Sequence, residues 1–241
     1  MFATKWPAAL LLPFSLLYLF VTWLRNFLYE AGVLRQWKLP CAVIAVGNLT
    51  VGGTGKTPMV ELIARTLRDR GKRVCVISRG YKRRRRGLVV VSDGHQTLAG
   101  LEHSGDEPLM LAKKLQGVPV IVDRDRVRAG RLAIERFGAQ VLVLDDAFQH
   151  RRLRPDISVV LVDAMRGFGN GWLLPAGPLR EPASRLAAAT VVVLTRAEGP
   201  RTDVPIVAKV RKYTRAPLLT ARHVPVDLVG ADGTTRELRA L

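Results

Sequence analysis

Residues 50–57 (TVGGTGKT) constrain the fold more than any other part of the 241-residue chain. They follow a short apolar run at 41–46 that is typical of a fully buried strand, and they precede a helix expected from Pro58 to about Arg70. A glycine-rich turn between strand and helix that ends in Lys-Thr is typical of a phosphate-binding loop, because backbone N–H groups and the helix N-terminus then surround an anion. The sequence therefore predicts an α/β protein that binds a nucleotide.

Each residue of this loop is a candidate for contact with the nucleotide. Lys56 is expected to reach the β- and γ-phosphates of ATP, and the Thr57 hydroxyl is expected to ligate Mg²⁺. The first position, where the general pattern has glycine, is Thr50, while Gly52 and Gly53 supply the backbone freedom. A dinucleotide-binding fingerprint is disfavoured, because its glycine spacing is missing and Lys-Thr has no role in it. The predicted ATP-binding residues are Thr50, Val51, Gly52, Gly53, Thr54, Gly55, Lys56 and Thr57.

Apolar runs and helical patterns alternate through the rest of the chain. The expected strands are residues 74–78, 118–122, 141–145, 157–163 and 190–194, and the expected helices are 107–116 and 126–137. Recurrent βα units of this kind build a P-loop NTPase-type parallel sheet flanked by helices. A small hairpin with strands at 88–92 and 97–101 is expected as an insertion, and a C-terminal β-ribbon is expected from 218–229 and 234–241.

Two adjacent aspartates, Asp145 and Asp146, end the apolar run at 141–144. In P-loop phosphotransferases, a carboxylate at the carboxyl end of a strand beside the phosphate-binding loop meets the metal ion of the nucleotide. We therefore expect one of the pair to hold Mg²⁺, and assign the metal to Asp145 and a catalytic role to Asp146. The alternative is a loop carboxylate that only caps the following segment.

Residues 6–24 contain no charged side chain and are dominated by Leu, Phe, Val, Tyr and Trp. The span is long enough to cross a hydrocarbon core of about 30 Å as a helix. Pro7 and Pro13 weaken a straight spanning helix, and aromatic residues such as Trp23 and Tyr29 favour the headgroup level, so a monotopic anchor is expected. The alternatives are a spanning helix, a cleaved signal peptide without an evident cleavage site, and a buried core helix.

Basic residues outnumber acidic ones by 38 to 20, which gives a net charge of +18. Such a balance indicates a polyanionic neighbour: nucleic acid, an anionic membrane or a phosphorylated substrate. The densest cluster, KRRRR at 82–86, favours a membrane surface, where each cation near anionic lipid contributes about 1 kcal/mol. No nucleic-acid partner is expected, because no recognition-helix, RNA-stacking or finger motif accompanies the charge. The two cysteines, Cys41 and Cys75, lie in apolar runs and indicate a reducing compartment.

Five segments carry a more specific pattern, in order along the chain: VGNLTVGGTGKTP at 46–58, SRGY at 78–81, GDEP at 105–108, DDAFQHRRL at 145–153 and FGNGWLLPAGPLREP at 168–182. Together they resemble the tetraacyldisaccharide 4′-kinase (lipid A 4′-kinase) family over about residues 10–240. The resemblance implies transfer of the ATP γ-phosphate to the 4′-hydroxyl of tetraacyldisaccharide 1-phosphate, the lipid A precursor. It also implies a monotopic or peripheral location at the cytoplasmic face of the Gram-negative inner membrane, with the anionic membrane surface as a partner.

The resemblance also implies roles for individual residues. Asp106 of the GDEP motif would be the catalytic base, since a carboxylate within hydrogen-bond reach can accept the proton of a sugar hydroxyl. Sequence alone favours a capped helix start for Asp106, and a plain surface role is the alternative for His150 and the arginines. The implied catalytic residues are Asp106, Lys56 and Asp146, the metal-side residues are Thr57, Glu107 and Asp145, and the substrate-binding residues are Arg79, Tyr81, Arg124, Gln149, His150 and Arg180.

The expected domain organisation follows from these assignments. A membrane-associated helical segment covers residues 1–38, a P-loop kinase core covers 39–216, and the β-ribbon at 217–241 leads to a C-terminal domain that is absent from this chain. The family pairs its aspartate base with a histidine of that domain. We therefore expect ATP binding to persist in this chain and full catalysis to need the missing histidine. A monomer is expected.

Two other functions stay open at this point. A membrane-associated P-loop switch ATPase without a lipid acceptor has a similar loop, although its usual lysine before the paired glycines is replaced here by Val51. A nucleic-acid-binding ATPase would fit the positive charge and would bind DNA or RNA in a salt-sensitive way.

Overall fold

The computed structural model of the protein describes residues 8–81, 83–84, 86–197, 205–222, 224, 227–229 and 234–237. Within these residues, the centre is an eight-stranded sheet of order β3-β4-β2-β5-β1-β6-β7-β8, parallel throughout except for β3. The strands are β1 (Ala42–Asn48), β2 (Val74–Ser78), β3 (Val89–Ser92), β4 (Val120–Val122), β5 (Val141–Leu144), β6 (Ile157–Asp163), β7 (Val191–Thr195) and β8 (Leu218–Ala221). The predicted α/β class with a parallel sheet is confirmed.

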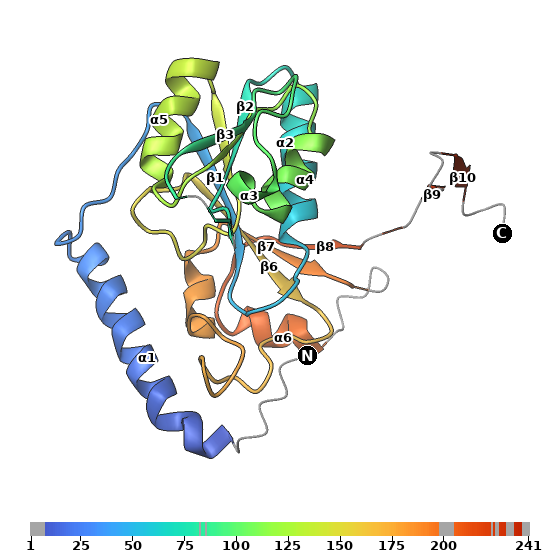
Figure 1. The fold of residues 1–241 in the computed structure, drawn as a ribbon. Helices are drawn as coiled ribbons and strands as arrows, with labels where there is room; N and C mark the ends of the chain where they lie inside the picture. The colour runs from blue at the N-terminus through green and yellow to red at the C-terminus, as the bar shows by residue number, and fades with distance from the viewer. Residues whose placement is uncertain are drawn as a thin grey trace.

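Helices cover both faces of this sheet (Figure 1). The helices of the described residues are α1 (Ala8–Glu30), α2 (Lys56–Asp69), α3 (Leu101–Ser104), α4 (Asp106–Lys114), α5 (Arg126–Phe137), α6 (Pro205–Arg211) and the 3-10 helix η1 (Ala183–Ala188). Side chains alternate along the strands: on β1, Ile44 and Val46 pack with α2 and α4. Val43 and Ala45 point to the opposite face and pack with α5. Burial on both faces explains why the strands read as continuous apolar runs.

The predicted hairpin at 88–92 and 97–101 forms only at its turn. Thr97 forms an antiparallel bridge with Ser92, and the Leu98 N–H donates to the Val91 carbonyl oxygen at 2.7 Å, but residues 97–101 do not continue as a strand. β3 pairs antiparallel with β4 at the edge of the sheet. The Asp93 carboxylate closes the turn after β3 by accepting two backbone hydrogen bonds, each of 2.9 Å. Leu101 then opens α3, so the return strand ends before it.

The predicted ribbon is shorter than expected. Residues 218–221 form β8, which pairs in parallel with β7 after the crossover helix α6. Leu218 packs against the core cluster beside β7, which gives this segment an apolar reason to join the sheet. The ribbon itself is β9 (Asp227–Val229) paired antiparallel with β10 (Thr235–Glu237), set away from the sheet (Figure 1). Residues 230–233, the turn of the predicted ribbon, lie outside the described residues. So do two residues of the basic run at 82–86.

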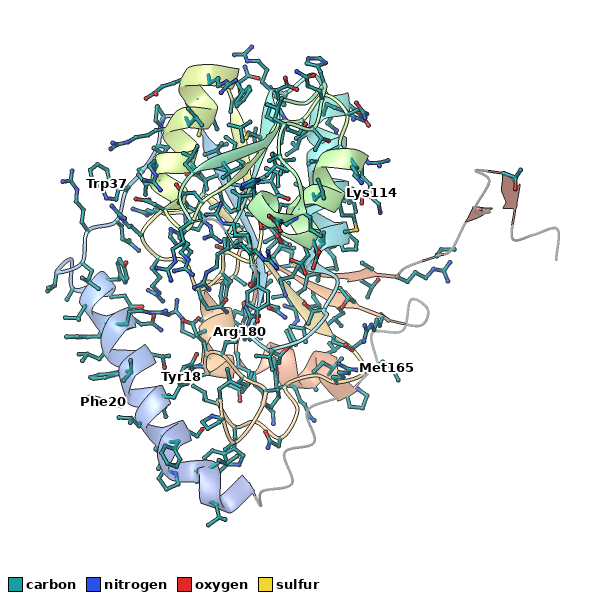
Figure 2. The ribbon with its side chains drawn as sticks, viewed as in Figure 1. Tyr18, Phe20, Trp37, Lys114, Met165 and Arg180 are labelled. Carbon is teal, nitrogen blue, oxygen red and sulfur yellow. The ribbon has the colours of Figure 1, made fainter. Side chains whose placement is uncertain are left out.

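Helix α1 lies along one side of the molecule, with Tyr18 toward the body and Phe20 pointing away from it (Figure 2). It is continuous, although Pro13 stands inside it. The stretch Leu10–Glu30 is long and apolar enough to cross a membrane by length and composition alone, a test that some core helices and signal sequences also pass. Since only 17% of its apolar window is buried, the expectation of a buried core helix does not describe α1.

The most buried residues of α1 are polar, although Tyr18 and Leu19 on the same side also pack against the core. Ser15, Thr22 and Asn26 are buried, whereas Phe14 and Leu17 are 61% and 62% exposed. The Ser15 hydroxyl donates a hydrogen bond of 2.8 Å to the carbonyl oxygen of residue 173. The helix therefore keeps polar residues at its most buried positions and large apolar side chains exposed, unlike a helix of a soluble protein, whose exposed face is polar.

Candidate active site

The loop after β1 opens into a cavity of about 1580 Å³. β1 lies where the strand order reverses, and ligands of open α/β sheets bind at the carboxyl ends of the strands at such a point. Pockets for a single small ligand are usually about 300–1000 Å³, so this cavity has room for a nucleotide and an acceptor together. It reaches from the glycine-rich loop to the inner face of α1, where Leu11, Tyr18 and Arg25 line it.

The glycine-rich loop has the conformation that its sequence predicts. Residues 51–57 all line the cavity, and α2 begins at Lys56. Gly55 caps that helix with a φ of 83°, a left-handed conformation that glycine adopts without strain. Thr50, the irregular position, forms a bridge with Leu179 and does not have a positive φ, so a side chain is tolerated there.

Lys56 and Asp146 form part of a charged chain at the floor of the cavity. Lys56 Nζ lies 3.3 Å from Asn48 Oδ1 and 3.7 Å from Asp146 Oδ1. Arg180 Nη1 donates to both carboxylate oxygens of Asp146 at 2.9 Å. Burial alone would raise the pKa of Asp146, but the charges of Lys56 and Arg180 lower it overall. Asp146 is therefore an ionised link that holds two cations beside the loop.

Asp145 has a different environment from its neighbour. It is 1% exposed, and the Ser78 hydroxyl donates to its Oδ2 at 3.0 Å. Burial, followed by the negative charge of Glu107, raises the pKa of Asp145 to about 6. Its Oδ1 is buried without a hydrogen-bond partner in the described part of the chain, although the residue lines the cavity. An orphaned carboxylate oxygen of this kind fits a cation ligand.

The GDEP motif forms the start of α4. Glu107 lines the cavity, whereas Asp106 is exposed and does not line it, so the assignment of Asp106 as base stays a prediction. Gly105 has a φ of 85°, and a Cβ there would lie 2.8 Å from the Tyr81 carbonyl oxygen. Across the described ranges, no three His, Cys, Asp or Glu side chains converge as a metal centre. Mg²⁺ on nucleotide phosphates needs only one or two protein carboxylates, so Asp145 and the Glu107 beside it remain suitable.

All six predicted substrate-binding residues line the same cavity; they are Arg79, Tyr81, Arg124, Gln149, His150 and Arg180. Gln149 Nε2 donates to the Asn48 carbonyl oxygen at 2.7 Å, which places it next to the end of β1. Burial, and then the charge of Arg126, lower the pKa of His150 to about 4. His150 is therefore a neutral imidazole at physiological pH and can exchange hydrogen bonds with a hydroxyl group.

Arg126 is a site residue that the sequence did not reveal. It is 3% exposed and lines the cavity. Its Nη1 donates to the Asp123 carbonyl oxygen at 3.2 Å and its Nη2 to the Asp145 carbonyl oxygen at 3.5 Å, so it joins the ends of β4 and β5. Burial, and then the charge of Arg79, lower the pKa of Arg126 to about 10, which leaves it cationic. In sequence it is one of many arginines in an arginine-rich helix start, a pattern typical of a solvated surface.

Helix α1 is tied to the segment that carries Arg180. The Tyr18 hydroxyl donates to the Arg180 carbonyl oxygen at 3.0 Å, and Arg25 Nη2 lies 2.6 Å from Glu181 Oε1. The Glu181 side chain is only 1% exposed; burial raises its pKa, and Arg25 opposes that shift. Neither contact could be predicted, because the partners are more than 150 residues apart.

Comparisons with known proteins agree with this geometry. A family model described as LpxK, tetraacyldisaccharide-1-P 4′-kinase, matches residues 7–241. A curated tetraacyldisaccharide 4′-kinase of Syntrophus aciditrophicus is 47% identical over 94% of this chain and 64% of its own length. One from Pelobacter propionicus is 49% identical over 78% of this chain and 52% of its own. A crystal structure of LpxK from Aquifex aeolicus in complex with ATP has a TM-score of 0.82 at 39% identity, and the match covers 97% of this chain and 70% of that one. The chain thus spans about half to two thirds of the length of these curated relatives.

Proposed function

This chain belongs to the tetraacyldisaccharide-1-phosphate 4′-kinase family, and on that premise we propose that it transfers the γ-phosphate of ATP to the 4′-hydroxyl of tetraacyldisaccharide 1-phosphate in lipid A biosynthesis. One observation carries the proposal: a single cavity joins the phosphate-binding loop, the paired aspartates and all six expected acceptor-side residues. A switch ATPase would have no need of a cavity that continues from its nucleotide loop to an apolar helix.

In the proposed reaction, the loop N–H groups and Lys56 bind the triphosphate. Lys56 is already oriented by Asn48 and Asp146, so little side-chain entropy is lost when the phosphates arrive. Arg180, held by Asp146, is a second cation within the cavity and can interact with the charge on the transferred group. Most of the rate enhancement would come from this positioning and charge neutralisation.

Mg²⁺ would be held by Thr57, Asp145 and Glu107, together with the nucleotide phosphates. The ion would neutralise charge on the β- and γ-phosphates during transfer. Asp145 supports this assignment, because it has one free carboxylate oxygen and, with a pKa of about 6, loses its proton near neutral pH. Asp106 would accept the proton of the 4′-hydroxyl, supported by its place on the first turn of α4 beside Glu107.

The test is a transfer assay with γ-labelled ATP and the monophosphorylated disaccharide lipid. We expect label on the lipid with a full-length parent of this chain, and a loss of roughly two orders of magnitude or more in its Lys56→Met variant, because the cation on the phosphates is gone. Lys114→Met is the matched control, since that lysine is exposed and pairs with Glu61 away from the cavity. Equal ATP hydrolysis with and without lipid, and no labelled lipid, would overturn the kinase proposal in favour of a switch ATPase.

We also propose a monotopic location at the cytoplasmic membrane face, where ATP is available. α1 hydrogen-bonds to the body through its polar face and presents its apolar side chains outward, which suits a helix that lies in the interfacial plane. A helix that crossed the bilayer would have to expose that polar face to lipid or give up these contacts.

Binding to vesicles of anionic phospholipid tests this location. Phe20→Glu places a charge on the outward face of α1 and is expected to lower sedimentation with the vesicles strongly. Met165→Glu is the control, because Met165 is equally apolar, is 74% exposed and lies on another side of the molecule (Figure 2). Equal loss in both variants would contradict a membrane contact through α1.

A further inference from the structure

Arg196 stands at the end of β7 and lines the cavity beside the glycine-rich loop. Its side chain is 52% exposed, so it forms part of the cavity rim rather than the floor. Its φ of 56° is a left-handed conformation that is uncommon for a residue with a side chain. Strained backbone of this kind persists where surrounding contacts hold it, which makes the position a candidate for function.

Two contacts fix the guanidinium group of Arg196. Its Nη1 lies 2.9 Å from Asp163 Oδ2, and its Nη2 donates to the Gly53 carbonyl oxygen at 3.2 Å. Asp163 ends β6 and is 2% exposed, so the ion pair is anchored in the sheet. Both terminal nitrogens therefore already have protein acceptors, and the plane of the group is held in one orientation.

The contact with Gly53 places Arg196 on the outer side of the loop. In a phosphate-binding loop the N–H groups point toward the phosphates, and a carbonyl such as that of Gly53 points away from them. The neighbouring Thr195 hydroxyl donates to the Thr54 carbonyl oxygen at 3.0 Å, which joins the end of β7 to the same outer side. A phosphate-binding arginine would instead keep its N–H fork free for the anion.

We propose that the face of the Arg196 guanidinium is the platform on which the purine base of the phosphate donor stacks. The inference rests on the proposed function, because it assumes that the loop holds the triphosphate of ATP. With its N–H edge engaged by Asp163 and Gly53, the group offers its flat face, and guanidinium faces stack favourably on aromatic rings. The base lies at the opposite end of the nucleotide from the γ-phosphate, and Arg196 lies outside the phosphate cradle.

The test compares equilibrium binding of ATP and of inorganic tripolyphosphate, measured calorimetrically on the detergent-solubilised protein with Mg²⁺. In Arg196→Met, which keeps side-chain length but removes the planar cation, we expect ATP affinity to fall roughly tenfold and tripolyphosphate affinity to stay within about twofold. Arg196→Lys, which keeps the positive charge but has no flat face, is expected to lose most of the same ATP affinity. Arg154→Met is the matched control, because Arg154 is an exposed arginine before the amino end of β6, whereas Arg196 follows the carboxyl end of the parallel strand β7.

The possible results separate this inference from the proposed function. Unchanged ATP affinity in Arg196→Met overturns the platform, and so does an equal loss for ATP and tripolyphosphate, because the residue would then act on the phosphates or on loop shape. Wild-type protein that binds tripolyphosphate but not ATP also overturns it. Wild-type protein that binds neither ligand refutes the nucleotide site itself, and with it the proposed kinase.

Discussion

Replacing Asp145 by asparagine is expected to make the protein more stable at neutral pH, although it removes a residue of the proposed site. Burial raises the pKa of Asp145 from 3.8 to about 6, which corresponds to about 3 kcal/mol of penalty on the charged form. Asparagine can still accept the Ser78 hydrogen bond, but its amide leaves a buried donor unpaired at a cost of about 1–2 kcal/mol. The net gain of about 1–2 kcal/mol should raise the melting temperature by roughly 3–6 °C.

The gain has a defined pH dependence. As pH rises from 3.8 toward 6, Asp145 loses its proton in the unfolded chain but keeps it in the folded one, so wild-type stability falls relative to the variant. The charge penalty of about 3 kcal/mol on the wild type should therefore be full above about pH 6.5 and vanish below about pH 4. Below pH 4 only the unpaired amide is left, so the variant should be about 1–2 kcal/mol less stable than the wild type. Asp146→Asn is the matched control and should have the opposite effect on stability. The charges of Lys56 and Arg180 lower the pKa of Asp146, so removing its negative charge should destabilise the protein at neutral pH.

Tryptophan fluorescence during thermal unfolding, in detergent without nucleotide or metal, measures both effects, and a transfer assay measures the accompanying loss of activity. The reasoning is refuted if Asp145→Asn melts below the wild type at neutral pH. It is equally refuted if the gap between the two proteins stays constant on acidification, because the gain would then not come from the Asp145 charge.

Three further substitutions test other parts of the site. Asp106→Asn should lower kcat in the transfer assay by roughly 10²- to 10⁴-fold with an unchanged KM for ATP, since a base acts on the acceptor; a raised KM for ATP with unchanged kcat would contradict this role. Gly105→Ala places a Cβ 2.8 Å from the Tyr81 carbonyl oxygen at a φ of 85°, and should destabilise the protein by about 1–3 kcal/mol in urea unfolding. Arg25→Met removes the 2.6 Å ion pair of the buried Glu181 and leaves it only the longer contacts with Asn26 and Arg185, so it should cost up to about 3 kcal/mol by the same measurement.

Controls for the last two substitutions come from the same chain. Gly32→Ala also has a positive φ, of 74°, but no atom lies within 4 Å of the added Cβ, so a loss equal to that of Gly105→Ala would mean that the Tyr81 contact is irrelevant. Adding Glu181→Gln to Arg25→Met removes a buried charge that has lost its shortest ion pair, and should recover part of the lost stability. No recovery would show that Arg25 acts through packing of its stem.

Much of the site could be predicted because its signals are local. The loop at 50–57 specifies its own conformation, since glycines, the helix N-terminus and Lys56 are neighbours in sequence. The paired aspartates at the end of an apolar run are equally local, and the structure places both in the cavity. The hairpin strand predicted at 97–101 formed only at its first residues. The turn signal after β3 was real and local, but the chain enters α3 at Leu101 instead of continuing the strand.

Residues that depend on distant partners could not be predicted. Arg126 has the local pattern of a surface arginine, and it becomes a buried site residue only because β4 and β5 end next to each other. Arg196 gains a fixed orientation only when the ends of β6 and β7 meet the glycine-rich loop. Leu218 is part of strand β8, which pairs with β7 only because the crossover helix α6 places the two strands side by side.

The sequence by itself determined the α/β class, the nucleotide loop, the apolar character of α1 and the family. These features can be predicted from residues that are close in sequence, because strands, helices and a glycine-rich turn depend on residues a few positions apart. Only the tertiary structure decided which face of α1 turns outward and which carboxylate of the pair is ionised at low pH. Both depend on burial and on charges brought together from distant segments, as Arg25 meets Glu181 and Arg180 meets Asp146.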